Sequence, residues 1–432
     1  MGKVLSLLTI GIIFLFITSL GCVSTRPVDR SYPNEVLTTP TTIVPPSTQL
    51  PSSNLELPPI EAGKGRIIFN YEKLPKEVII REINDDFLLG VGTTAPEGGI
   101  PSNILKNLRI GGVNYYLPFI TWASIEHQEG NYNGIPTPGL GTISWLKNSG
   151  ATLNGHCFIF FHDVTYVTPR FAYNRPFDEQ KRMIERFVKT TVARFPEIDI
   201  WTLNEPMYQN SFGWTDEQNY DIFVSVSKWV HEVNPKAKVM INMVPIADRG
   251  AGRNYEPEKV LDELFKRGLE ADIVGVELYH FWVNQDERDE YGYPKIEWIK
   301  NKVDIFKKYK LPIIFSEVGI PGIVDNKPQF DKQAEWLEKF IRYCHNDTHV
   351  KGIVWYFVVD DSFMPYAGLV ESDNSYRPVY YSLLKMAHEI FPSTTYTIGN
   401  RSYVDIEPGK YDIIINQKII PINVIEGKGV II

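Results

Sequence analysis

Short apolar segments follow one another along most of the chain. Eight such runs are rich in β-branched and aromatic residues and are apolar on both faces. They are Phe87–Thr93, Val113–Ile120, Thr152–Phe161, Asp199–Asn204, Lys238–Val244, Asp272–His280, Leu311–Glu317 and Lys351–Val359. Runs of this length without a polar face are typical of buried parallel strands. The pattern therefore predicts eight strands with both faces covered.

Between these runs, apolar positions recur at the spacing of an amphipathic helix. The clearest segments are Glu179–Arg194, Glu217–Val233, Pro257–Leu269, Ile296–Tyr309, Gln329–Cys344 and Val379–Ile390. Strands that alternate with helices form βαβ units around a parallel sheet. Eight units in about 300 residues favour an α/β fold of the (β/α)8 TIM-barrel type. No glycine-rich phosphate loop follows a predicted strand, which argues against a nucleotide-binding open sheet.

We assign the barrel to residues 86–392 and expect small β-rich flanks on both sides of it. Residues 61–85 contain a strand-like alternation, and residues 393–432 have the pattern of short strands joined by turns. The two flanks are candidates for one joint β module. A structural cap is favoured over a carbohydrate-binding role, because no cluster of aromatic residues marks a sugar platform there.

The N-terminus has the pattern of an export signal. Within residues 1–22, one lysine precedes a long apolar run that ends in Gly21-Cys22. This order resembles a lipoprotein signal, in which Cys22 would receive the lipid, and a cleaved signal peptide or an uncleaved anchor is the alternative. Residues 23–60 are rich in Pro, Ser and Thr, which predicts an extended linker. We therefore expect an exported protein, either anchored at the cell surface or secreted.

Composition excludes several classes of function. The net charge of -8 gives no electrostatic basis for binding nucleic acid. Three cysteines, Cys22, Cys157 and Cys344, give no disulfide framework. The eight histidines lack the spacing of metal ligands, so we expect neither a metal nor another cofactor. The sequence does not indicate an oligomeric state.

Two glutamates follow predicted strands, at the end of the barrel where active sites of this fold lie. Glu205 ends the fourth strand in Trp-Thr-Leu-Asn-Glu-Pro, and Glu317 ends the seventh in Ile-Phe-Ser-Glu-Val-Gly. One such carboxylate is more often a helix cap or an ion-pair partner, but two at one barrel mouth favour a shared task. Cleavage of a glycosidic bond needs this pair, because one group protonates the leaving oxygen while the other attacks the anomeric carbon.

The order of these motifs resembles glycoside hydrolase family 10, the endo-β-1,4-xylanases, within the clan of retaining barrel glycosidases. The segment from Gly155 to His162 resembles that family's Gly-His…Trp-His segment. Residues 201–205 resemble its Trp-Asp-Val-Val-Asn-Glu segment, and residues 314–318 resemble its Thr-Glu-Leu-Asp strand. Residues 354–363 resemble its final strand, including the spacing of two ring positions. The likeness extends from Phe87 to Ile390 and leaves out the leader, the linker and the C-terminal flank.

This resemblance implies roles for named residues. Glu205 would be the acid/base and Glu317 the nucleophile of a double displacement. Asn204 and His162 would bind sugar hydroxyls in the cleavage subsite. Trp355 would form the floor on which the sugar stacks.

Further positions depart from the family and carry weaker expectations. Phe363 replaces the second Trp of the final strand, and Glu277 replaces a Gln. We expect both to bind the substrate, and pairing with a neighbouring cation is the alternative for Glu277. Tyr279 replaces a His that touches the nucleophile, and we expect it to hydrogen-bond Glu317 and hold it ionised. Trp122 is a second candidate for stacking on a sugar, with core packing as an equal alternative. His156 is expected to be a core histidine.

The family's Glu-Asn group after the second strand, which grips the next sugar, is replaced here by Leu117-Pro118. Xylan is therefore one candidate substrate, and another β-linked polysaccharide or oligosaccharide is the alternative. The sequence predicts a retaining hydrolase and leaves transglycosylation, sugar, linkage and endo or exo mode open. The rival hypothesis is a non-catalytic, surface-tethered glycan-binding barrel. Two facing carboxylates count against it, because like charges at short range are unfavourable. A structural envelope protein would explain the tether but not these glutamates.

Overall fold

The computed structural model describes residues 57–69, 77–83, 86–93, 100–162, 167–208, 210–247, 255–398 and 403–432. Residues 1–56 include Cys22 and most of the predicted linker, and they lie outside this description. Among the residues described, no helix is long and apolar enough to cross a membrane.

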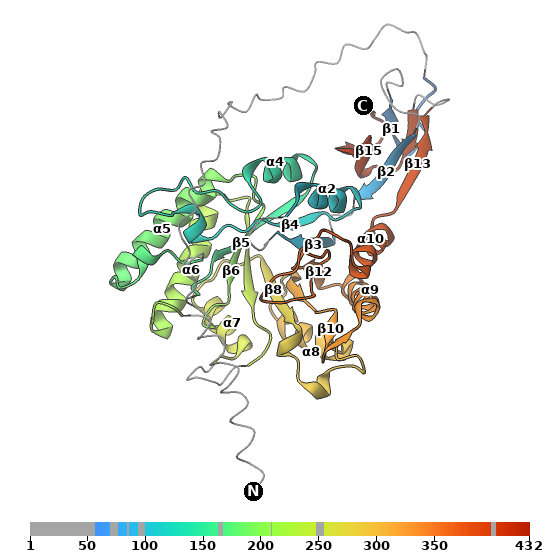
Figure 1. Ribbon diagram of the computed structural model, residues 1–432. Coiled ribbons are helices and arrows are strands. Elements are labelled where there is room, and N and C mark those ends of the chain that lie inside the picture. The colour runs from blue at the N-terminus through green and yellow to red at the C-terminus, as the bar shows by residue number, and fades with distance from the viewer. Residues whose placement is uncertain are drawn as a thin grey trace. The chain divides into compact units, whose positions relative to one another are not determined.

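Eight parallel strands close into a barrel in the order β12-β3-β4-β5-β6-β7-β8-β9 (Figure 1). They are β3 (Leu88–Gly92), β4 (Tyr115–Leu117), β5 (Thr152–Ile159), β6 (Ile200–Asn204), β7 (Lys238–Met243), β8 (Ile273–Tyr279), β9 (Ile313–Gly319) and β12 (Val350–Trp355). Each strand overlaps one of the eight apolar runs, in the same order along the chain. The predicted (β/α)8 TIM barrel is confirmed.

Helices alternate with these strands and form the outer layer of the barrel (Figure 1). The six expected helices are α5 (Phe177–Arg194), α6 (Asp216–Val233), α7 (Pro257–Lys266), α8 (Ile296–Lys307), α9 (Phe330–Asn346) and α10 (Pro378–Ile390). Shorter helices also occur at α2 (Ser102–Ile110), α3 (Trp122–Ile125) and α4 (Leu140–Asn148), with 3-10 turns at Arg170–Ala172, His280–Trp282 and Gln285–Glu287. A small hairpin joins β10 (Ile323–Val324) to β11 (Lys327–Pro328). α6 begins with a capping box at Thr215, and α7 begins with a proline, as helix starts favour.

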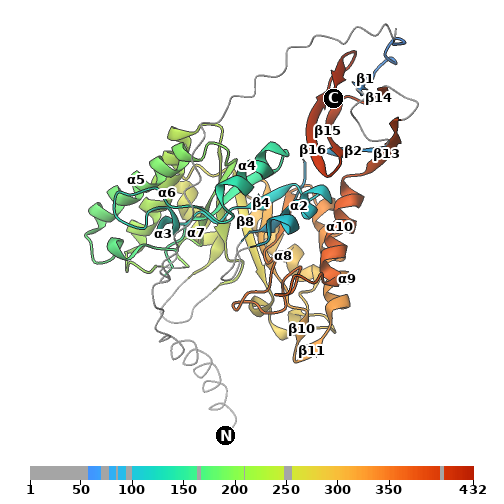
Figure 2. The same ribbon diagram turned by 45° about the horizontal axis from the view of Figure 1, so that its top comes forward.

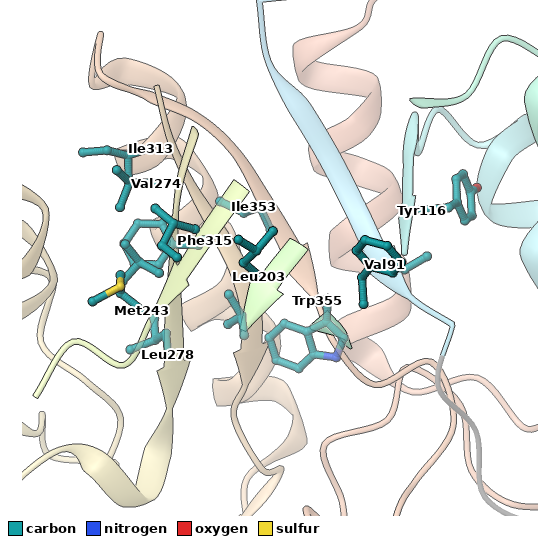
Figure 3. Packing of buried hydrophobic residues seen from close by; sticks show 14 of the residues in the cluster. Val91, Tyr116, Leu203, Met243, Val274, Leu278, Ile313, Phe315, Ile353 and Trp355 are labelled. Carbon is teal, nitrogen blue, oxygen red and sulfur yellow. The ribbon is translucent and has the colours of Figure 1, made fainter. Parts of the chain in front are cut away.

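Two apolar clusters cover the outer and the inner face of the barrel sheet. The larger lies between strands and helices, and Figure 3 shows part of it, including Phe315 and Trp355. The smaller fills the barrel interior with Tyr115, Leu117, Ile200, Met240, Ile273, Ile314 and Val354. Ile314 and Phe315 are neighbours in sequence but belong to different clusters, because side chains alternate between the two faces of a strand.

The two flanks together form a β module of two sheets. One sheet has the order β14-β1-β17 and the other the order β13-β2-β15-β16. The strands are β1 (Gly65–Ile68), β2 (Glu77–Ile83), β13 (Ser393–Thr397), β14 (Tyr403–Ile406), β15 (Gly409–Ile415), β16 (Lys418–Val424) and β17 (Gly429–Ile431). Strands from before and after the barrel therefore pair within each sheet. Their shared core includes Ile67, Val78, Ile80, Val404 and Ile413.

A buried ion pair fastens this module to the barrel. Arg109 in α2 donates to both carboxylate oxygens of Asp412 in β15, at 2.6 and 3.0 Å, and both side chains are 1% exposed. Arg81 in β2 donates to the backbone carbonyls of Arg109 and Ile110 at the end of α2, and burial lowers the pKa of Arg81 to about 10. Figures 1 and 2 show the module beside α2 and α10. Because α2 ends where it turns into β4, these contacts lie at the amino ends of the barrel strands.

Candidate active site

Three glutamates lie at the carboxyl ends of the barrel strands. Glu205 directly follows β6, Glu277 lies in β8 and Glu317 lies in β9. In the register between β8 and β9, Glu277 pairs with Glu317, and an irregularity there leaves Ser316 without a strand partner across β8. The two glutamates expected from the sequence therefore share one end of the barrel with a third.

Hydrogen-bond donors surround the carboxylate of Glu317, which is 6% exposed. The hydroxyl of Tyr279 donates to Oε2 at 2.6 Å. The amides of Asn204 and Asn242 donate to Oε1 at 3.2 and 3.0 Å. Nε2 of His156 lies 3.0 Å from the same oxygen, at an angle outside hydrogen-bond geometry. Donors at both oxygens stabilise a negative charge on this buried side chain.

Tyr279 occupies the position beside Glu317 that the sequence suggested. Burial, and then the neighbouring carboxylate of Glu317, raise the pKa of Tyr279 well above its usual value, so its hydroxyl remains a donor. A Cβ on Gly319 would lie 2.6 Å from the ring of Tyr279. The glycine in β9 therefore leaves the space that this ring fills.

The backbone of Glu205 has an uncommon conformation. Its φ is +50°, a left-handed value that residues with a side chain seldom adopt, and Pro206 follows it. The backbone N–H of Glu205 donates to the carbonyl of Asn242 at 2.9 Å, which holds this turn against β7. Such strain costs on the order of 1–3 kcal/mol and concentrates at functional positions. Unlike Glu277 and Glu317, Glu205 is only partly buried.

Glu277 is the most deeply buried of the three carboxyl groups, with 1% exposure. Its pKa is raised well above the usual value by burial, then by the charges of Glu317 and Glu205, and by a hydrogen bond with Glu205. Glu277 therefore contacts Glu205 directly and is linked to Glu317 through the amide of Asn242. The sequence assigned Glu277 to substrate binding. In the structure it is buried, and its contacts are with the other carboxyl groups of the site.

Asn242 connects two of these carboxyl groups and was missed by the sequence reasoning. Its Nδ2 donates to Oε1 of Glu277 at 2.8 Å and to Oε1 of Glu317 at 3.0 Å. The hydroxyl of Ser316 donates to its Oδ1. A Cβ on Gly275 would lie 2.6 Å from that oxygen, so this glycine makes room for the amide. The available signal was a lone amide side chain near the end of the apolar fifth strand.

A bulge in β5 brings two further residues to the site. The register between β5 and β6 shifts after Gly155, and Cys157 has a φ of +53°. His156, expected to be a core residue, is buried but adjoins Glu317. Burial, followed by the charges of the three glutamates, raises the pKa of the Cys157 thiol well above its usual range. This thiol stays protonated beside the carboxyl groups.

The structure corrects the expectation for Trp355. Its side chain is 0% exposed, lies in the cluster between strands and helices (Figure 3), and donates to the carbonyl of Ala367 at 2.8 Å. It offers no face to a sugar. Because side chains alternate along β12, the next residue, Tyr356, faces the site instead and contacts the ring of His156 at 5.4 Å between centroids.

Trp122 also belongs to the core. Its ring stacks on Phe187 with centroids 5.8 Å apart, and its Nε1 donates to Glu126 at 2.6 Å. The core alternative therefore describes Trp122, and the stacking role does not apply in this structure.

Exposed aromatic rings do occur at the mouth. Phe363, which is 59% exposed, contacts the ring of Tyr279 edge-on at 5.5 Å. Phe281 is also exposed and stacks on Tyr279 at 5.3 Å, and the sequence reasoning missed it. His162 lies beyond the end of β5, partly buried, with its ring 5.4 Å from that of Phe160.

Asn204 has one satisfied and one unsatisfied polar atom. Its Nδ2 donates to Glu317, whereas its buried Oδ1 has no hydrogen-bond partner among the described residues. A buried acceptor without a donor is costly, and a ligand hydroxyl would satisfy it.

No group of three or more His, Cys, Asp or Glu side chains within the described ranges could hold a metal ion.

No family model and no curated protein sequence matches the chain. Solved structures do. Xylanase 10B from Thermotoga petrophila RKU-1, in complex with xylobiose, is similar with a TM-score of 0.53 and 19% identity over 71% of this chain and 95% of that one. Xylanase10C from Cellvibrio japonicus, in complex with xylopentaose, is similar with a TM-score of 0.55 and 14% identity, over 74% of this chain and 69% of that one. A family 39 glycoside hydrolase from Bacteroides cellulosilyticus WH2 is similar with a TM-score of 0.55 and 15% identity, over 78% of this chain and 72% of that one.

At these identities the likeness shows the fold. It joins this chain to the barrels of two glycoside hydrolase families, 10 and 39, both of clan A. The resemblance to family 10 seen in the sequence is thus confirmed as a likeness of structure, and the chain has the (β/α)8 barrel fold that these enzymes share.

Proposed function

We propose that this protein is a retaining glycoside hydrolase that cleaves β-glycosidic bonds in a polysaccharide or oligosaccharide. One observation carries the proposal: Glu205 and Glu317, at one end of the barrel, have opposite surroundings. Glu317 is buried and accepts hydrogen bonds at both oxygens, whereas Glu205 is partly exposed and contacts a second carboxyl group. Two carboxyl groups whose environments differ in this way suit the nucleophile and the acid of a double displacement.

In the first step, a carboxylate oxygen of Glu317 attacks the anomeric carbon. The bond from that carbon to the leaving oxygen breaks, and Glu205 gives its proton to this oxygen. In the second step, Glu205 takes a proton from water, the water oxygen bonds to the anomeric carbon, and the ester to Glu317 breaks. Retention requires the two carboxyl groups to be about 5–5.5 Å apart. A sugar hydroxyl in place of water would give transglycosylation.

The rest of the mouth supports binding of a sugar. Oδ1 of Asn204 is a buried acceptor that suits a hydroxyl of the substrate. The exposed rings of Phe281 and Phe363 offer an apolar surface beside Tyr279 on which a sugar face can stack. His162 remains a further candidate for a hydroxyl contact. The complexes of similar barrels with xylobiose and xylopentaose support a β-linked substrate, with xylan as one candidate.

The test uses the purified chain without its leader and a panel of aryl β-glycosides (xyloside, xylobioside, cellobioside, glucoside and mannoside). We expect at least one of these to be hydrolysed. Glu317→Ala should lose activity by about 10⁴-fold or more, as loss of a nucleophile does. Glu205→Ala should be rescued by azide, with a β-glycosyl azide as product. Glu297→Ala, at an exposed position on α8, is the matched control and should keep full activity.

A folded protein that is inert on the whole panel, yet binds a glycan on an array, would overturn the proposal. It would favour the rival function, a glycan-binding barrel without catalysis. An α-glycosyl azide from the rescued variant would instead contradict the assignment of Glu205 as the acid/base of a retaining enzyme.

A further inference from the structure

The proposed mechanism uses two carboxyl groups of the three at the barrel mouth. Glu277 has no task in it, although burying an ionisable group is costly unless the site uses or pairs it. Its side chain is 1% exposed, and it lies between the strands that carry Asn242 and Glu317. This burial leaves little room for contact with a substrate.

Glu277 has hydrogen-bond contacts with both Asn242 and Glu205. Nδ2 of Asn242 donates to Oε1 at 2.8 Å, so this oxygen is an acceptor. The same amide donates to Glu317, and Ser316 donates to its Oδ1, which fixes the orientation of Asn242. Glu277 also forms a hydrogen bond with the carboxyl group of Glu205. A hydrogen bond between two carboxyl groups needs a proton on one of them.

The surroundings of Glu277 disfavour a negative charge on it. Glu205 faces it from the end of β6 and Glu317 from β9, and both act as like charges. Cys157 in β5, Tyr255 before α7 and Tyr279 in its own strand also interact with it. Burial raises the pKa of each of these three groups above its usual range, so all three are neutral near pH 7. Two carboxylates in direct contact cannot both ionise without a large cost.

We propose that Glu277 is a positioning residue: a neutral carboxylic acid whose Oε1 accepts from Asn242 and whose Oε2 carries a proton donated to Glu205. This inference rests on the proposed role of Glu205 as acid/base. When Glu205 gives its proton to the leaving oxygen, it becomes a carboxylate. The hydrogen bond from Glu277 then becomes charge-assisted and stronger. Glu277 keeps its own proton throughout, so the bond stabilises the charge that develops on Glu205.

Two substitutions separate this role from a structural one. Glu277→Gln keeps the shape, an acceptor for Asn242 and a neutral donor for Glu205. The pH profile of its kcat/KM should therefore match that of the wild type. Glu277→Leu removes the donor, which should lower kcat by about 10- to 100-fold and move the basic limb to higher pH, because ionised Glu205 loses a donor. If Glu277 were ionised, Glu277→Gln would instead remove a negative charge and move the basic limb down by about one pH unit or more, and that result would overturn the inference.

An infrared difference spectrum at pH 7 tests the same point without turnover. The difference spectrum, wild type minus Glu277→Gln, should contain a carboxylic acid carbonyl band, because the variant lacks this group. The control variant Glu297→Gln, at an exposed position, should show the loss of a carboxylate band instead. Loss of a carboxylate band in Glu277→Gln would refute a neutral Glu277. Because the spectrum needs no substrate, a failure of the inference remains distinguishable from a failure of the proposed function.

Discussion

Removing the hydroxyl of Tyr279 tests how Glu317 is kept ready as a nucleophile. Tyr279→Phe deletes the hydrogen bond of 2.6 Å to Oε2 and leaves the amides of Asn204 and Asn242 on Oε1. The phenyl ring retains the same packing beside Gly319, so the change is confined to one donor.

The magnitude follows from the kind of bond that is lost. A hydrogen bond to a charged group contributes about 1.5–3 kcal/mol. This donor stabilises the carboxylate of Glu317, which attacks the anomeric carbon. Its loss removes one of the hydrogen bonds that orient this carboxylate. At 1.36 kcal/mol per tenfold change in rate, kcat/KM should fall by about 10- to 100-fold.

The assay is kcat/KM at one fixed pH for the best substrate of the panel. Tyr293→Phe is the matched control, because it removes another buried hydroxyl, one bonded to the carbonyl of Gln329 at 3.3 Å, and should leave kcat/KM unchanged. An unchanged kcat/KM in Tyr279→Phe would refute the assigned role of Tyr279. An equal fall in both variants would point to a general loss of stability.

Three further changes test other parts of the account. Arg109→Ala leaves the buried Asp412 without its partner and should lower the free energy of unfolding in urea by about 3–5 kcal/mol; an unchanged unfolding midpoint would contradict the role of this pair. Gly275→Ala places a methyl group against Oδ1 of Asn242 and should reduce kcat while the far-ultraviolet circular dichroism stays unchanged; full activity would show that Asn242 tolerates displacement. We also propose export with a lipid on Cys22, in which case Cys22→Ser should move the protein from the membrane fraction to the soluble fraction, whereas a simple cleaved signal peptide predicts no change.

The barrel could be predicted because its strands are apolar on both faces and its longer helices are amphipathic. α2 and α4 escaped prediction because each has only nine residues, and neither has an N-cap side-chain hydrogen bond or an acidic residue in its first turn. The pairing of strands from both flanks depends on contacts between residues more than 300 positions apart, such as Arg81 with Asp412 in the register of β2 and β15. Local sequence patterns do not contain that information.

The same features that reveal buried strands conceal which side chains enter the site. β12 is apolar on both faces, so the sequence offered no basis for choosing Tyr356 over Trp355 as the inward residue. Asn242 lacks a motif of its own, and His156 belongs to the Gly-His segment but was expected in the core. Both reach Glu317 only because the barrel closes and β5 bulges. Glu205 and Glu317 were visible because each is a carboxylate placed directly after or within an apolar run.

The most direct test of the central claim is to trap the covalent intermediate. An aryl 2-deoxy-2-fluoro-β-glycoside of the sugar that the enzyme hydrolyses should inactivate the protein and add one glycosyl unit to it. Peptide mass spectrometry should then locate that unit on Glu317. An adduct on Glu205 or Glu277, or steady turnover of the natural linkage with inversion and no adduct, would contradict the account.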